Sequence, residues 1–104
     1  MPEATPVVIT PEGEIDLHSS AFVKDQLEPL ITAKRPKVIV DLSGVSYIDS
    51  AGLATFIEAM QRIQAYGGLF ALCGLRESTQ HIFAIARLDQ VFRIFPDQAA
   101  ALAG

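Results

Sequence analysis

Two short runs of apolar residues, Val38-Ile39-Val40 and Leu69-Phe70-Ala71-Leu72-Cys73, most constrain how this 104-residue chain can fold. Apolar runs without polar alternation are typical of strands that are buried on both faces of a parallel sheet. Helical spacing of apolar residues separates the two runs, and right-handed helical crossovers are the economical way to connect parallel strands. The sequence therefore predicts the α/β class, with one mostly parallel sheet of four or five strands. About four helices should cover one face of the sheet or both.

Strand-like and helix-like patterns alternate along the whole chain in the order β–α–β–α–β–α–β–α. Ser19 or Ser20 can cap the first helix, and Pro29 should kink or end it because proline lacks a backbone donor. Gly67-Gly68 should stop the second helix, and Pro96 suits the first turn of the last one. The expected elements are a strand or short hairpin at the sheet edge over 7–9 and 14–16, a helix over 19–33, a strand over 37–42, a turn at 43–44 that leads into 45–48, a helix after 50, a strand over 69–73, a helix over 77–87, a strand over 91–95 and a helix over 97–103.

Composition limits the classes of function. Half of the residues are apolar and 19% are charged, which suits one packed domain spanning 1–104, with 1–6 as a short or disordered N-terminal extension. The net charge of −4 disfavours direct binding to nucleic acid or to anionic lipid. Cys73 is the single cysteine, residues 1–10 lack a signal-peptide pattern, and no apolar run reaches the about 20 residues of a membrane helix. We expect a cytoplasmic protein without membrane insertion.

The stretch Asp41–Leu53 carries the chemistry, because a buried strand ends in it and a long helix follows at once. We expect Ser50 to be the N-cap, with its hydroxyl accepting from the backbone two or three residues on. Free N–H groups and the helix dipole favour negative charge there, and the small Ala51 and Gly52 would let another molecule approach. A phosphate on Ser50 would add roughly 1.5 to 2 negative charges. Spacing alone favours a plain turn and cap, because serine is a common N-cap residue.

The residues Asp41-Leu-Ser-Gly-Val-Ser-Tyr-Ile-Asp-Ser-Ala-Gly-Leu53 resemble the signature of the STAS domain, the fold of bacterial anti-sigma factor antagonists. The resemblance extends to Gly13-Glu-Ile-Asp16, to Gly67-Gly68 and to Leu88-Asp-Gln-Val-Phe92, and it covers about residues 7 to 104. Family members usually carry one more N-terminal strand, for which this chain leaves little room.

The resemblance implies a protein switch rather than an enzyme, with no cofactor. The unmodified antagonist would bind an ATP-dependent anti-sigma factor serine kinase and free a sigma factor. Phosphorylation of Ser50 would end the complex, and a PP2C-type phosphatase would reset the switch. Carried over to this chain, Ser50 is the phospho-acceptor and Asp49 the acidic residue before it. The remaining implied partner-binding residues are Ala51, Gly52 and Leu53, with Asp16 on a neighbouring loop. Oligomeric state stays open.

An alternative role exists within the same fold. STAS domains also serve as accessory or scaffold subunits of lipid or anion transport systems and of signalling complexes. There the serine region would be a docking surface that is never phosphorylated. The ATPase that co-purifies would separate the roles, because one predicts an anti-sigma factor kinase and the other a transporter ATPase.

The sequence gives weaker support to two further hypotheses, a hydrolase and a metal-binding protein. A hydrolase would need Gly-x-Ser-x-Gly around Ser50, but Ile48 replaces the first glycine, and His18 and His81 are lone histidines. One cysteine and two distant histidines do not make metal-ligand spacing, so no metal site is expected. We interpret the stripe after Ser50 as core and the other motif hydroxyls as turn or loop groups that are secondary modification sites at most. The stripe is Leu53, Phe56, Ile57, Met60 and Ile63, and the hydroxyls are Ser43 and Ser46.

Overall fold

The computed structural model describes residues 5–104, which form six strands and four helices. Strands β1, β3, β5 and β6 form a parallel sheet in that order, and β2 pairs in parallel with β4 in a separate two-stranded sheet. The predicted α/β class is confirmed. The elements are β1 (Val7–Ile9), β2 (Gly13–Ile15), α1 (Ser20–Thr32), β3 (Lys37–Asp41), β4 (Val45–Ile48), α2 (Ser50–Ala65), β5 (Leu69–Cys73), α3 (Glu77–Ile85), β6 (Arg93–Phe95) and α4 (Gln98–Ala103).

The expected parallel sheet is confirmed as the four-stranded sheet, but a second, two-stranded sheet was not expected. Of the two alternatives for the first segment, the edge strand is confirmed and the hairpin is wrong. β1 is an edge strand that pairs with β3 as far as Ile9 and Val40, and after a break the same two chain segments pair again as β2 and β4. Gly13, at φ +84°, bends the first segment, and its N–H donates to the carbonyl of Gly44 at 2.8 Å. The two-stranded sheet is therefore a continuation of the β1–β3 pair beyond a shared bend. Within the described residues no strand precedes β1, and residues 1–4 of the expected extension lie outside them.

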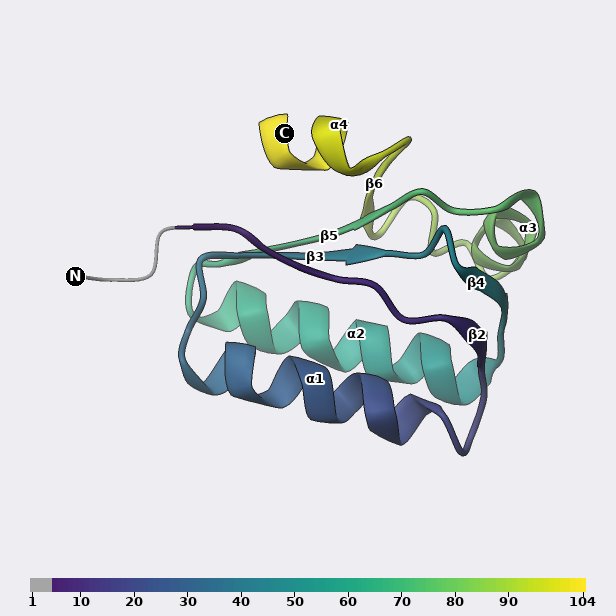
Figure 1. Cartoon of the computed structure of the whole chain (residues 1–104), viewed down its shortest axis with the longest axis horizontal. Helices are drawn as coiled ribbons and strands as arrows, with labels where there is room; N and C mark the ends of the chain where they lie inside the picture. The colour runs from purple at the N-terminus through teal and green to yellow at the C-terminus, as the bar shows by residue number, and fades with distance from the viewer. Residues whose placement is uncertain (1–4) are drawn as a thin grey trace.

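The main sheet lies between two layers of helices (Figure 1). α1 and α2 cover one face, α4 crosses the other, and α3 lies at the end of the molecule beside β4. Alternate strand residues serve the two faces. Val38, Val40, Phe70 and Leu72 belong to the larger core cluster with α1 and α2, whereas Ile39, Ala71 and Cys73 pack with Ala101 of α4.

The helix ends follow local backbone rules, with two corrections. Pro29 does not end α1, which continues to Thr32, because the backbone bond from Ala33 N to Pro29 O maintains the last turn. Pro96 lies outside α4, because Asp97 is the N-cap and accepts from Ala100 N at 2.9 Å. Gly67, at φ +85°, ends α2 as predicted.

Aromatic packing fixes α3 against the rest of the core. Phe83 of α3 is fully buried, and its ring meets the ring of Phe92 edge-on, with centroids 5.6 Å apart. Phe92 lies 6.1 Å from Phe70 of β5, and Phe70 lies 6.3 Å from Phe56 of α2. This row of rings holds α3 beside the start of α2 and so sets the geometry of the surface between them.

Polar contacts hold α4 on the opposite face. Lys37 Nζ donates to the carbonyls of Leu102 at 3.0 Å and Gly104 at 2.8 Å, and Gln98 Nε2 donates to Asp41 Oδ2 at 2.6 Å. Burial raises the pKa of Asp41, but the hydrogen bonds from Gln98 and from Ser43 outweigh it and hold that pKa below its usual value. Asp41, the first residue of the motif, therefore has a structural role.

The Cys73 thiol lies in the interior beneath α4. Burial raises its pKa to about 11, and the carboxylates of Asp41 and Asp97 add to the effect. Such a thiol is a small core group. Within residues 5–104 no helix combines the length and the apolar character needed to cross a membrane.

Candidate functional site

The N-terminus of α2 is built by Asp49, not by Ser50. Asp49 Oδ1 accepts hydrogen bonds from the backbone of Ala51 at 2.9 Å and of Gly52 at 3.1 Å. The prediction that Ser50 is the N-cap is therefore wrong by one residue. The reason is that Asp49 prolongs the β2–β4 ladder, with its N–H donating to the carbonyl of Ile15 at 3.0 Å. Its extended backbone is the conformation an N-cap needs.

This shift leaves Ser50 as the first helical residue, with its side chain exposed. Its hydroxyl is not needed for capping. Two of the N–H groups expected to be free for an anion are instead bound by the Asp49 carboxylate. Asp49 thus offsets the positive end of the α2 dipole, and charge added to Ser50 would face the solvent beside it.

Gly52 lies inside the molecule rather than on an open contact surface. A Cβ at Gly52 would stand 2.7 Å from Ile48 Cγ2, 2.8 Å from Ile15 Cγ2 and 3.1 Å from the carbonyl oxygen of Ile15. The predicted role of Gly52 in letting a partner approach is corrected by this contact, because the close approach is between α2 and its own β2–β4 sheet. Ala51 and Leu53 are half-buried and keep an accessible edge.

Asp16 orders the loop between β2 and α1. Its Oδ1 accepts from the backbone amides of His18 and Ser19, both at 2.9 Å, and from the Ser19 hydroxyl at 3.1 Å. The backbone amide of Ser19 contributes most to a pKa of Asp16 below the usual value, against an opposing effect of burial. Ser19 is the N-cap of α1, but its hydroxyl turns back to Asp16 and to the carbonyl of Glu14, so it does not cap the helix.

An open groove of about 300 Å³ lies beside Ser50, between the start of α2 and α3. Ile85 is 81% exposed and Tyr47 is 47% exposed. Sequence reasoning placed Leu53 in this region but missed the contribution of α3 and of Tyr47. The groove, called the Ser50 groove below, is lined by Tyr47, Ile48, Asp49, Ser50, Leu53, Ile82, Ile85 and Ala86.

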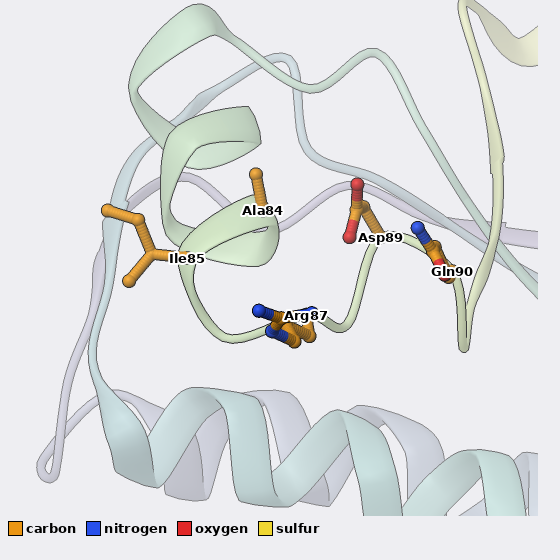
Figure 2. A pocket seen from close by; sticks show the side chains of 5 residues that line it. All are labelled: Ala84, Ile85, Arg87, Asp89 and Gln90. Carbon is orange, nitrogen blue, oxygen red and sulfur yellow. The ribbon is translucent and has the colours of Figure 1, made fainter.

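The orientation of α3 explains why its apolar residues reach this surface. Thr79 and Phe83, four residues apart, form its buried face. Ile85 lies off that face, and Figure 2 shows it projecting away from Arg87, Asp89 and Gln90. Arg87, Asp89 and Gln90 line a second hollow of about 370 Å³ together with Ile85. Since Ile85 also lines the Ser50 groove, it stands between the two hollows. At the start of α3, Ser78 Oγ donates to the carbonyl of Ser46 on β4 at 2.9 Å.

Burial distinguishes the predicted core residues of α2 from the histidines and serines that were also considered as site residues. Phe56, Met60 and Ile63 are buried as predicted, while Leu53 and Ile57 pack against the core from its margin. His18, in the Asp16 loop, and His81, on α3, are exposed, as are Ser43 and Ser46. Among residues 5–104 no three His, Cys, Asp or Glu side chains gather in a way that could hold a metal ion.

Comparison with known proteins agrees with this architecture. A family profile described as the STAS domain matches residues 2–101. The chain belongs to the STAS domain family. The anti-sigma-B factor antagonist of Bacillus subtilis is 32% identical over 82 residues, which cover 79% of this chain and 74% of that protein.

Several solved structures share the fold. The phosphorylated form of the Bacillus cell fate determinant SpoIIAA has a TM-score of 0.74 and 20% identity, covering 99% of this chain and 93% of that one. A sulfate transporter family protein from Wolinella succinogenes has a TM-score of 0.77 and 17% identity, covering 94% of this chain and 82% of its own. At such identities the likeness is one of fold, so the role of Ser50 has to be argued from its surroundings.

The capping role predicts different stabilities for adjacent substitutions. Asp49→Ala should lower the free energy of unfolding by about 1 kcal/mol because two backbone donors lose their partner. Asp49→Asn should retain most of that stability, and Ser50→Ala should stay within about 0.5 kcal/mol of the parent. Urea unfolding followed by circular dichroism measures all three. A larger loss for Ser50→Ala than for Asp49→Ala would contradict the assignment of the cap.

The close contact at Gly52 predicts that a single methyl group is harmful there. Gly52→Ala gains helix propensity, but the β-branched methyl groups of Ile15 and Ile48 cannot move aside freely. Overpacking should win, with a net loss of about 1–2 kcal/mol in denaturant unfolding. Ala54→Ser, which adds one atom at an exposed position of the same helix, is the matched control and should be near neutral. Equal stabilities of the two variants would disprove the contact.

Proposed function

We propose that this chain is an anti-sigma factor antagonist that binds a serine kinase through the Ser50 groove and is released when Ser50 is phosphorylated. The partner is an ATP-dependent anti-sigma factor kinase, and its capture frees a sigma factor. A PP2C-type phosphatase restores the binding form. Asp16, Asp49, Ala51 and Leu53 border the contact, and the domain itself contributes no catalytic group.

The observation that carries the proposal is an exposed, non-capping hydroxyl on the rim of an apolar groove. A kinase can reach Ser50 without unwinding α2, since Asp49 holds the cap. Apolar partner side chains that enter the groove would contact Leu53, Ile82 and Ile85. Docking and modification therefore share one small surface, as a switch requires.

Electrostatics explain why phosphate would reverse the binding. A partner that covers the groove must remove water from Ser50, which costs little for a hydroxyl that finds a hydrogen bond. A phosphate with nearly two charges loses far more hydration, and apolar neighbours do not replace it. The amides of Ala51 and Gly52 cannot compensate while they remain bound to Asp49. Phosphorylated Ser50 is thus more stable in water than beneath an apolar partner, so phosphorylation weakens binding.

Variants at Ser50 test the switch in the native host. Ser50→Ala should retain a kinase in pull-downs with ATP and magnesium, whereas Ser50→Asp should retain at least about tenfold less, a difference of 1.4 kcal/mol. Peptide mass spectrometry of the parent chain, incubated with the captured kinase and ATP, should place the phosphate on Ser50. Ser46→Ala, a change at a nearby exposed serine, is the control and should be phosphorylated normally. Capture of a transporter ATPase with Ser50 unmodified would overturn the proposal in favour of the accessory role.

The groove itself is tested at its most exposed large apolar side chain. Ile85→Ser should leave the unfolding free energy nearly unchanged, because Ile85 is 81% exposed. The same change should weaken kinase binding by about tenfold, as expected for loss of an apolar anchor. Leu102→Ser, at a residue 45% exposed on α4, is the matched control and should bind like the parent. Equal affinities of the two variants, measured by calorimetry, would show that α3 lies outside the interface.

A further inference from the structure

A separate groove of about 220 Å³ lies between the β1–β2 connection and the first turns of α1. It shares no lining residue with the Ser50 groove. The β2–β4 sheet separates the two, since Ile15 lines one groove and its register partner Ile48 lines the other. This second groove, called the Phe22 groove below, is lined by Pro11, Glu12, Glu14, Ile15, Ser19, Phe22, Val23 and Gln26.

The Phe22 groove exposes more apolar surface than the fold requires. Phe22 is 72% exposed, and Leu17 on the adjoining loop is also 72% exposed. The core is complete without them, because Ile15 and Val23 form the buried floor. An exposed aromatic ring on the wall of a hollow with an apolar floor is the kind of surface that marks an interaction site.

Charge determines the kind of occupant that fits. Glu12 and Glu14 line the groove, and Asp25, three residues after Phe22, lies on the same side of α1. None of the lining residues is basic. Lys24, the one cation in the sequence of α1, is turned toward α2, where its Nζ lies 3.7 Å from Glu58. The groove therefore combines an apolar floor and an exposed aromatic ring with carboxylates that α1 does not neutralise.

We propose that the Phe22 groove is a second docking site, which receives an arginine-bearing apolar segment of a protein partner. The guanidinium would lie over the Phe22 ring and pair with Glu12 and Glu14, since arginine combines stacking with carboxylate binding. Its aliphatic stem would cover the floor, and a neighbouring apolar residue of the segment would cover Leu17. Nucleic acid and anionic membranes are repelled by the same carboxylates. The proposal does not rest on the function proposed for Ser50.

A peptide titration of the whole chain tests this site. The probe is acetyl-Ala-Leu-Arg-Leu-Arg-Ala-amide, and the matched probe carries glutamate in place of both arginines. The arginine peptide should shift amide resonances of residues 11–26 in nitrogen–proton spectra, and the glutamate peptide should not. Phe22→Ser should weaken binding about fivefold, and the pair Glu12→Gln with Glu14→Gln should abolish the preference for arginine.

Controls at the other groove keep the two proposals distinguishable. Ile85→Ser exchanges an apolar side chain that is 81% exposed, against 72% for Phe22, for serine, and Ser50→Asp alters charge at the other groove. Both should bind the arginine peptide like the parent. Equal shifts with the two peptides, shifts confined to the Ser50 groove, or unchanged affinity of Phe22→Ser would each overturn the second site. None of these results bears on whether Ser50 is phosphorylated.

Discussion

The contact between the first turn of α2 and the β2–β4 sheet determines the rest of the site. Gly52 packs directly on Ile15 and Ile48, and Asp49 N–H extends the ladder to the carbonyl of Ile15. A larger residue than glycine would push α2 outward and separate Ser50 from the Asp16 loop and from α3. The small residue of the motif thus serves internal packing, and the surface beside Ser50 exists because that packing is tight.

Two tasks that a single serine could combine are divided here between neighbouring residues. Asp49 caps the helix and offsets its dipole, while Ser50 faces the solvent without a structural duty. If Ser50 were the cap, modification of its hydroxyl would also disturb α2. With the cap on Asp49, charge can change at Ser50 while the fold stays the same, so the response is confined to the surface that a partner covers.

The sequence predicts those features of the structure that depend on residues close together in the chain. The buried runs of β3 and β5, the stop at Gly67 and the buried members of the α2 stripe, Phe56, Met60 and Ile63, are set by local patterns, and the structure confirms them. Leu53, which was expected in the same core stripe, instead lines the Ser50 groove. The sequence pattern places the N-cap of α2 at Ser50, but the structure places it at Asp49. That difference depends on the hydrogen bond from Asp49 N–H to the carbonyl of Ile15, which lies 34 residues away in the chain. The separate β2–β4 sheet and the two grooves likewise arise from segments that meet only in the folded chain, so no local pattern identifies them.

The size of the Ser50 groove bears on how complete a charge switch can be. A hollow of about 300 Å³ admits only a few side chains, so the affinity that it contributes is modest. Dehydrating a phosphate is costly by comparison, and a partner held only here would be released almost fully. A partner that also binds beyond the β2–β4 sheet would retain part of its affinity after modification, because contacts that do not touch the charge are unaffected by it. If Ser50 is phosphorylated as we propose, complete release would therefore depend on how far the partner extends past Ser50, and not on the phosphate alone.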